Sequence, residues 1–523
     1  MGAAMKDDRQ RLSFALGFAP DADPLAAGVV TDCRNFVPTH RGMQALQAPV
    51  YVSGTPATDG PVFTAQSVLA YWRPAPASYI GTNAEYAATE DALFMRNDRW
   101  SAWTDITPAS KVNPTGFWTF TSLGQVPIGA EGGSVLQAPT PIAGGSLYTL
   151  PTLDSSGTDA TLISGAPTCC IVTSAERFVL AFNGRGGDND TWNCSARDNH
   201  ASWTLSPSTL AAQGRLVEPF GPITAAVPMG NDVIAYKATA AIRGRFVPGD
   251  VEVWKWAKVP LGIGAAGPRS VSILPDGRHA VMNSESCWIF DGAQAIDVLE
   301  GRARQWFQDL LINRTYQNGG MAPVYDGIRN CVWFTFKGLT LETPTYAIVY
   351  HLGTGKLGAV ELPADLIVET SGIHDSLADN GTRTAPGYFE STTHRMMAFG
   401  SAANSVASLT TSSAGAGGAE PVPVYIESGA AGDPFDLIDV TGIGLDLTKG
   451  RDAAGAATVE LRSRDARNDA NVTATAAHIG TGDRYAVRQS AHWHRVRVAP
   501  NGVPMELSGA WLRAAKSKSE RGG

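Results

Sequence analysis

The sequence predicts an all-β protein: a β-propeller of six or seven blades with an additional small β-sandwich-like module, formed by the C-terminal part of the chain and the N-terminal strands. Three observations lead to this prediction. Short apolar or alternating runs are separated by turn signals. Comparable aromatic residues recur about every 40–50 residues, which is the size of a propeller blade. The 56 Gly and 32 Pro residues among 523 supply the tight turns that many short strands need.

Residues 190–256 show this pattern most clearly. Trp192 lies in a first strand, Trp203 follows a polar turn, an apolar run covers residues 221–235, and Trp254 lies in a last strand after a Pro-Gly-Asp turn. Helical spacing never persists here, whereas short antiparallel strands with one or two aromatic anchors per group are typical of propeller blades. Further strand groups are expected around residues 67–72, 117–120, 178–182, 270–274, 286–292, 331–336 and 347–351.

The chain divides into five predicted segments. They are an N-terminal arm and strands (1–54), the propeller (55–400), a Ser/Ala/Gly-rich flexible linker or loop (401–420), a C-terminal β-module (421–512) and a basic tail (513–523). Pro and Asp residues disfavour regular structure in residues 1–27, which we expect to be an irregular arm. Residues 297–313 have the best helical spacing in the chain, with Trp306 and Leu310 four residues apart. This helix either docks a neighbouring subunit or is a packed connector between blades.

Composition excludes several classes of protein. Hydrophobic residues make up 44% of the chain and charged residues only 17%, so a large core is expected rather than disorder. The net charge of -8 argues against a protein that grips nucleic acid by neutralising phosphates, although a mildly acidic wall that DNA slides past remains compatible. We find no signal peptide and no apolar run long enough to span a bilayer, and therefore expect a soluble protein made in a cytoplasm.

Six cysteines, Cys33, Cys169, Cys170, Cys194, Cys287 and Cys331, include no CxxC pair. We expect buried free thiols in strands. The adjacent Cys169 and Cys170 leave a strained vicinal disulfide open as an alternative.

Three segments, taken together and in order, resemble a known family. The central one carries Trp192, Ser195, Trp203, Gln213, Gly214, Gly221, Pro222, Ile223, Tyr236, Lys237, Arg243, Phe246, Val247 and Trp254, and the flanking ones are residues 31–42 (TDCRNFVPTHRG) and 485–498 (YAVRQSAHWHRVRV). This pattern resembles the tail nozzle, or packaged-DNA stabilisation, proteins of short-tailed bacteriophages. The polar turn at residues 248–250 departs from the family, in which a more apolar Pro-containing turn is expected.

The resemblance implies a structural virion protein rather than an enzyme, with no cofactor and no metal. It would be located in the phage tail and made in the cytoplasm of the bacterial host. Six copies would form a ring below the portal and adaptor proteins, make the DNA exit channel and its gate, and carry tail fibre, spike or needle proteins. Genomic DNA would pass through the lumen without sequence-specific binding. The residues to which it assigns structural roles are Asn35, Pro38, Arg41, Gly42, Trp192, Trp203, Gly221, Pro222, Arg243, Phe246, Trp254, Arg488, Trp493, Arg495 and Arg497.

Contacts between copies are expected on the N-terminal strands and the C-terminal module, where the flanking segments lie. Arg41 and His40, in the turn 38–42, either contact such a neighbour or form a solvated turn. Gly42 is expected to supply a backbone angle that other residues resist.

Catalytic and metal-binding alternatives have weaker support. His492 and His494 have a spacing that can hold a metal on a strand, but no third or fourth ligand is near in sequence, so a structural pair is favoured. No phosphate-binding loop and no G-x-S-x-G motif is present. Asp188, Asp190 and Asp198 are interpreted as solvated turn residues rather than a glycosidase pair.

The alternative function is a receptor-binding or carbohydrate-active propeller tail protein. Thirteen Trp and thirteen Tyr residues could stack on sugars. Because they lie mainly in strand runs, we interpret most of them as anchors of blade cores.

Overall fold

The structure is a computed structural model of the chain. It describes residues 8–46, 50–51, 70–72, 85–88, 92–96, 104–107, 118–124, 126–130, 137–139, 153–155, 170–183, 189–250, 252–311, 320–337, 345–362, 364, 366–371, 394–400, 405–408, 423–466, 469–480 and 482–516. Nearly all regular elements in this part of the chain are β-strands, and no helix in it is long and apolar enough to cross a membrane.

Five four-stranded antiparallel sheets follow one another along the chain, each made of four consecutive strands. Blade 1 contains β7 (Ala70–Trp72), β8 (Glu85–Ala88), β9 (Leu93–Arg96) and β10 (Thr104–Asp105). Blade 2 contains β11 (Thr119–Leu123), β12 (Val126–Ala130), β13 (Gln137–Pro139) and β14 (Leu153–Ser155). Blade 3 contains β15 (Cys170–Thr173), β16 (Val179–Phe182), β17 (Thr191–Cys194) and β18 (Ala212–Arg215). Blade 4 contains β19 (Ile223–Met229), β20 (Asp232–Lys237), β21 (Ala241–Phe246) and β22 (Trp254–Lys258). Blade 5 contains β23 (Val271–Ile273), β24 (His279–Met282), β25 (Cys287–Phe290) and β26 (Ala295–Asp297).

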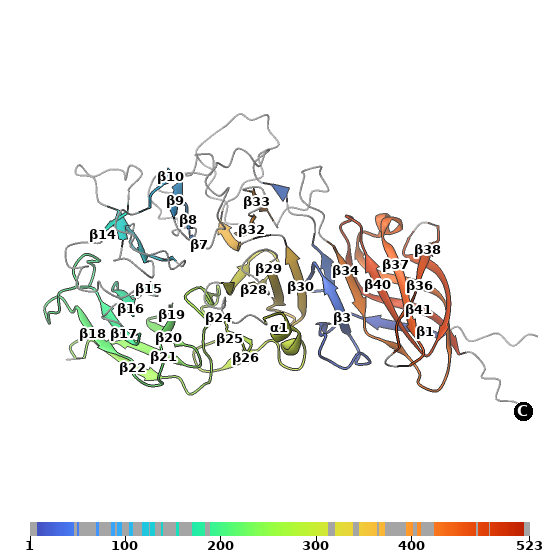
Figure 1. Ribbon diagram of the computed structural model, residues 1–523, viewed down its shortest axis with the longest axis horizontal. Coiled ribbons are helices and arrows are strands. Elements are labelled where there is room, and N and C mark those ends of the chain that lie inside the picture. Colours follow the sequence, from blue (N-terminus) through green and yellow to red (C-terminus); the bar gives the residue numbers. More distant parts are fainter. Residues whose placement is uncertain are drawn as a thin grey trace, which may run out of the picture.

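Two further blades complete the ring. Blade 6 contains β27 (Ala322–Asp326), β28 (Cys331–Lys337), β29 (Thr345–His351) and β30 (Leu357–Leu362). Blade 7 contains β31 (Leu366–Ser371), β32 (His394–Gly400), β33 (Ser405–Ser408) and, as its fourth strand, β6 (Val50–Tyr51) from the N-terminal part of the chain. The first strands of blades 2 to 7 lie next to one another in succession, and the blades form a ring in Figure 1. The predicted β-propeller is confirmed, with seven blades among the residues that the structure describes.

Central strands of the blades are buried on both faces because neighbouring blades cover them. All six residues of β20 and all seven of β28 are buried. Such continuous burial matches the uninterrupted apolar runs in the sequence, such as residues 331–336.

The second part of the fold combines both ends of the described chain. Its N-terminal strands are β1 (Asp8–Ser13), β2 (Gly17–Phe18), β3 (Val29–Arg34), β4 (Phe36–Pro38) and β5 (Met43–Ala45). Its C-terminal strands are β34 (Tyr425–Ser428), β35 (Ala431–Gly432), β36 (Ile438–Lys449), β37 (Thr458–Arg464), β38 (Val472–His478), β39 (Arg484–Ala491), β40 (Trp493–Ala499) and β41 (Glu506–Lys516), with a 3-10 helix at Arg451–Ala456.

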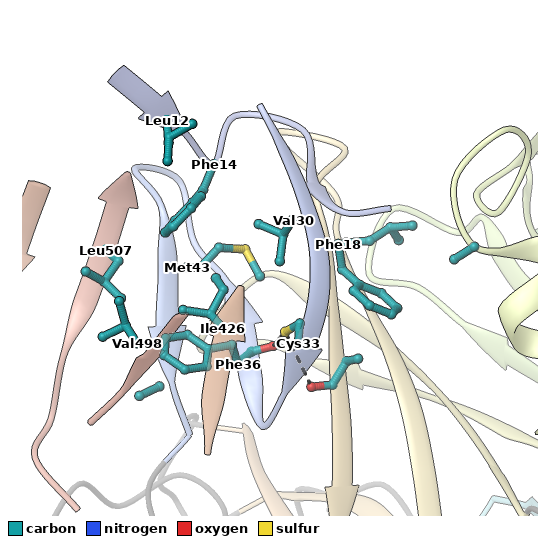
Figure 2. Close-up of a cluster of buried hydrophobic side chains, with 14 of the residues drawn as sticks. Leu12, Phe14, Phe18, Val30, Cys33, Phe36, Met43, Ile426, Val498 and Leu507 are labelled. Carbon is teal, nitrogen blue, oxygen red and sulfur yellow. Dashed lines mark hydrogen bonds between the residues drawn. The ribbon is translucent and has the colours of Figure 1, made fainter. Parts of the chain in front are cut away.

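We call this part the module. Its strands pair in the order β5–β41–β36–β39–β38–β37–β40–β34–β3. The circuit closes through β2 and blade 6, because β3 pairs with β2, β2 and β4 both pair with β30, and β4 pairs with β5. The two faces of the predicted sandwich are therefore continuous at their edges. Figure 2 shows that side chains from the two ends of the chain share its core, with Leu12, Phe14, Val30, Phe36 and Met43 lying near Ile426, Val498 and Leu507.

Propeller and module are joined by pairing as well as by the chain. The outer strand of blade 6, β30, pairs with both β2 and β4, so the sheet of this blade continues into the module. β2 and β4 thus lie between the two parts, and β6 then closes blade 7.

One helix, α1 (Arg304–Leu310), connects blades 5 and 6. It is shorter than the predicted helical segment, because residues 298–303 form bends and turns after β26. Phe307 is buried against Phe336, with 4.9 Å between the ring centroids, which favours the packed connector over the exposed docking helix. Asp21 accepts hydrogen bonds from the first helical N–H groups, 2.6 Å from the nitrogen of Gln305.

Three predicted segment assignments require correction. Residues 8–13 and 17–18 are strands, so the expected irregular arm is wrong there; β1 satisfies its backbone groups by pairing with a strand about 500 residues away. β33 lies inside the predicted linker, because the last blade needs it as a third strand. Strand β41 continues to Lys516 and includes the start of the predicted basic tail, because it pairs with β36 over its whole length.

Candidate functional site: the joint between propeller and module

Asn35 lies at the centre of the joint. It separates β3 from β4, is fully buried and has a φ of 58°, a left-handed conformation that Asn tolerates better than most residues. Its Nδ2 donates to the carbonyl of Pro423, 2.9 Å away, at the start of the module's C-terminal half. Its Oδ1 accepts from the backbone N–H of Glu361 in β30, 2.8 Å away. One side chain therefore links blade 6, the N-terminal strands and the C-terminal module.

The turn that follows is fixed against β41. Gly42 is buried, and a Cβ at this position would lie 2.1 Å from the carbonyl oxygen of Leu507. Its φ is not positive, so a close backbone approach, and not the expected special backbone angle, requires glycine here. Thr39 donates its hydroxyl to the buried carboxylate of Glu506, 2.6 Å away. Pro38 is buried in β4, whereas Arg41 is exposed at the tip of the turn.

A row of charged and aromatic side chains crosses the outer face of the joint, from β30 through β3 and β34 to β40. Arg34 pairs with Glu361 of blade 6. The Arg497 guanidinium lies 3.6 Å from the ring centroid of Tyr425, which is cation–π geometry, and burial raises the pKa of this tyrosine. Tyr425 also donates to Asp32 in β3, 3.4 Å away.

The row continues around Glu427, a nearly fully buried carboxylate in β34. Arg462 lies 2.9 Å and Arg495 lies 3.3 Å from its two oxygens. A buried carboxylate requires such partners because its desolvation is otherwise costly. The sequence prediction identified Arg495 and Arg497 but missed Glu427 and Tyr425, although a charged residue inside an alternating strand is the signal that could have identified Glu427.

Burial alternates along the strand of the His492-x-His494 motif. In β40, His494 is buried and its neighbours on the strand are half-buried. The His494 ring has protein partners on both nitrogens: Nδ1 lies 2.7 Å from the hydroxyl of Ser463, and Nε2 lies 2.9 Å from the carbonyl of Ile438. Burial lowers the pKa of this histidine, so it is neutral at pH 7. Both nitrogens are thus engaged in structural contacts.

Among the described residues, no group of three His, Cys, Asp or Glu side chains is arranged to hold a metal ion. Trp493, next to the buried histidine, packs closely over Gly432, where a Cβ would lie 2.7 Å from the indole ring. Arg488 in β39 is exposed and separate from the charged row.

The motif residues of the central segment lie between blades 3 and 4. Trp192 of β17 is buried, with its ring centroid 5.5 Å from that of Trp256 in β22. Trp254 and Phe246 lie 5.9 and 5.1 Å from Phe178 of blade 3. These aromatic residues pack one blade on the next, as the sequence predicts for blade anchors.

Trp203 plays the same part between blades 2 and 3. It is buried in a cluster of residues from both blades and donates its indole N–H to the carbonyl of His200, 2.7 Å away. Arg243 joins blade 4 to blade 5, since its guanidinium donates to the carbonyl of Gly292 and lies 3.7 Å from Asp232.

Gly221 and Pro222 belong to the loop between blades 3 and 4. Gly221 has a φ of 122°, which favours glycine. Lys237, missed as a site residue, is buried beneath this loop and donates to the carbonyl of Pro219, 2.6 Å away. The loop presents Phe220, which is 97% exposed.

Two of the three acids near this segment are paired within the protein. Arg215 makes two hydrogen bonds to Asp190, of 2.9 and 3.1 Å, and Arg177 pairs with Asp198. Asp190 is buried and not solvated, because the adjacent strand places Arg215 against it. Asp188 lies outside the described residues.

Comparisons with known proteins do not name a family. No family model and no curated protein matches the chain. Among solved structures, a putative 6-phosphogluconolactonase from Bacteroides uniformis is 16% identical over 64% of this chain and 90% of its own, with a TM-score of 0.33. YCF48 bound to D1 peptide is 12% identical over 66% and 98%, with a TM-score of 0.34. A chain of the mitotic checkpoint complex is 8% identical over 66% and 95%, with a TM-score of 0.35. These low values assign neither family nor activity, and the fold rests on the strand pairing described above.

Proposed function

We propose that the chain is a structural virion protein, the tail nozzle of a short-tailed phage. Six copies form a ring-shaped DNA exit channel and gate below the portal and adaptor proteins. One observation carries the proposal. The two flanking segments that resemble nozzle proteins, 31–42 and 485–498, lie in one module, where β3 pairs with β34 and β34 pairs with β40. The central segment forms the contact between blades 3 and 4.

The construction of the joint supports a mechanical role. A channel wall must keep its shape while DNA passes, so its parts should not rotate freely. Here β2 and β4 both pair with β30, and the Asn35 side chain bridges the same strand to the module. Linked sheets and buried, satisfied hydrogen bonds resist bending more than a single flexible linker does.

In this role the partners are other copies of the chain, the adaptor above, and fibre, spike or needle proteins below. DNA passes through the channel without sequence-specific binding. The proposed role is structural and includes no catalytic activity.

The first test is the assembly state of the purified chain, measured by mass photometry and negative-stain electron microscopy. Six-fold rings are expected. On particles of the phage that encodes the chain, immunogold label should lie on the tail axis between capsid and tip. Absence of a six-fold assembly from both the purified protein and the particle would refute the proposal, and label confined to peripheral appendages would favour receptor binding.

The carbohydrate alternative gains no support from five of the blade tryptophans. The described Trp118, Trp192, Trp203, Trp254 and Trp333 are all buried in blade cores. A glycan array probed with the purified chain would revive this alternative if it gave specific binding.

A further inference from the structure

One outer face of the module is basic. It consists of the outward-facing residues of β1, β41, β36 and β39, strands that lie side by side in this order; Figure 1 labels the first three at the same end of the molecule. Five arginines lie on this face, all exposed: Arg9, Arg11, Arg484, Arg488 and Arg513. We call it the basic face.

The module leaves most of this positive charge without a counter-charge. The register places two acids on the same face, Asp446 and Asp439. Asp446 lies 2.6 Å from Arg11, and Asp439 accepts a hydrogen bond from the hydroxyl of Ser490. Within the described part of the chain, Arg9, Arg484 and Arg488 make no ion pair.

The arrangement even places like charges together. Arg9 lies directly opposite Arg513 in the pairing of β1 with β41. The pair concentrates positive charge at one place on the face, which favours an acidic partner.

Shape and composition also suit a protein partner. Gly442 and Gly444 of β36 face outward in register with Ala486 and Arg484 of β39, leaving a strip with few large side chains. Trp511 borders the strip; it is 37% exposed, with the Arg11 guanidinium 5.5 Å from its ring centroid. Trp and Arg on a flat surface are the residue types that contribute most to protein interfaces.

The predicted propeller segment of the same chain carries a net charge of opposite sign. Residues 55–400, the predicted propeller segment, contain 23 Lys and Arg against 31 Asp and Glu, whereas the remainder of the chain contains 18 of each. The whole net charge of -8 therefore lies in this segment. On blade 5, for example, Glu285, Asp291 and Glu300 are exposed and make no ion pair with any described residue. Ile296, between them on the outer strand β26, is 52% exposed.

We infer that the basic face binds the acidic propeller of a second copy of this chain. The contact joins two different surfaces, which is the heterologous geometry that closes into rings. Complementary charge steers such encounters and fixes their register. The inference rests on the proposed ring and assigns its contact surface. Nucleic acid is the other polyanion that such a face could bind, but the charge separation within the chain favours the second copy.

The test is the double variant Arg484→Glu, Arg488→Glu, assayed by mass photometry across protein concentration and salt. Both side chains are exposed, so circular dichroism and Tm should match the wild type. We expect the apparent Kd of assembly to rise roughly 10–100-fold and wild-type assembly to weaken with salt. Lys258→Glu, a charge reversal at an exposed position on blade 4, is the matched control and should not weaken assembly.

A second measurement locates the contact. Lys449 is exposed at the end of β36, a strand of the basic face, so a zero-length carbodiimide reagent should couple it to acids in residues 55–400. Mixing ¹⁴N- and ¹⁵N-labelled copies shows whether the two ends of each link belong to different molecules. Mixed-isotope links are expected in the wild type and should be lost in the double variant.

The outcomes separate the inference from the proposed function. Normal rings in the double variant, without mixed-isotope links in the wild type, would overturn the inference and leave the nozzle proposal in place. Normal rings combined with loss of labelled duplex or single-stranded DNA binding would assign the face to nucleic acid instead. A wild-type chain that never assembles, in solution or on particles, would overturn both.

Discussion

Tyr236 and His279 share a buried hydrogen bond across the boundary between blades 4 and 5, with 2.8 Å between the phenol oxygen and Nδ1. The other ring nitrogen lies 3.0 Å from the carbonyl of Pro228. Because a carbonyl oxygen only accepts, Nε2 carries a proton, and in the neutral ring Nδ1 accepts from the tyrosine. Burial lowers the pKa of His279 to about 4.

This pair predicts a loss of stability in mild acid. The folded pKa of His279 lies below the ordinary value of 6.5, so the unfolded chain binds the proton more readily. The stability that results is present above pH 6.5 and is lost as the pH falls towards 4, by about 3 kcal/mol in total. Urea unfolding measured between pH 8 and pH 4 should show this slope, and His279→Gln should flatten it. An unchanged slope in the variant would show that other groups cause the acid sensitivity.

Asn35→Ala should weaken the joint. The substitution leaves the N–H of Glu361 and the carbonyl of Pro423 without partners inside the protein, and places Ala at a positive φ. We expect a loss of roughly 2–4 kcal/mol in the free energy of unfolding. The control is Asn501→Ala: that asparagine has a φ of 52° and its Nδ2 donates to Ala456 and Thr458, but it is exposed, so its loss should be smaller. Equal losses would mean that the buried position of Asn35 in the joint adds nothing to the effect.

Gly42→Ala should be destabilising for a steric reason. The new Cβ would lie 2.1 Å from the carbonyl oxygen of Leu507, which forces the turn away from β41. Overpacking of this kind costs about 1–3 kcal/mol. Gly262→Ala is the comparison, because nothing lies within 4 Å of its added Cβ and its φ is not positive. Thermal unfolding of the two variants side by side measures the difference, and a similar Tm for both would contradict the close approach.

The buried thiols should be unreactive in the native protein. Burial raises the pKa of Cys33 and Cys194 to about 12, and raises the pKa of Cys287 and Cys331 as well. Since the thiolate is the reactive species, iodoacetamide at pH 8 should leave all four unmodified until urea is added. Peptide mass spectrometry identifies each site. Rapid labelling of any of the four without denaturant would show that its strand opens under native conditions.

The local pattern of the chain predicts much of this fold, because blades are built from neighbouring strands. The alternation around His494 predicts which side chains of β40 face inward, and the apolar run of residues 331–336 predicts a strand buried on both faces. The aromatic residues Trp192 and Trp254 are placed correctly between blades for the same reason.

The features that the sequence did not predict depend on pairing between strands that are far apart in the chain. β6 has only two residues, too few for a pattern, and becomes a strand because blade 7 supplies its partner. Arg495 and Glu427 are 68 residues apart and meet only through the pairing of β34 with β40. The basic face depends likewise on the register of Arg9 with Arg513. Nothing within either segment specifies such a register, so local reasoning could not find these contacts.

The pairing of β1 with β41 also constrains how the protein is made. Arg9 leaves the ribosome about 500 residues before its partner Arg513. At a synthesis rate of about 5–20 residues per second, the first strand waits roughly 25–100 seconds for its place in the sheet. β6 also lacks a partner for most of that interval. It pairs with β33, which is made only shortly before the module's C-terminal half. The nascent chain therefore exposes unpaired strands for most of its synthesis. Chaperone engagement with residues 8–51 is a consequence that ribosome profiling of chaperone-bound nascent chains can detect.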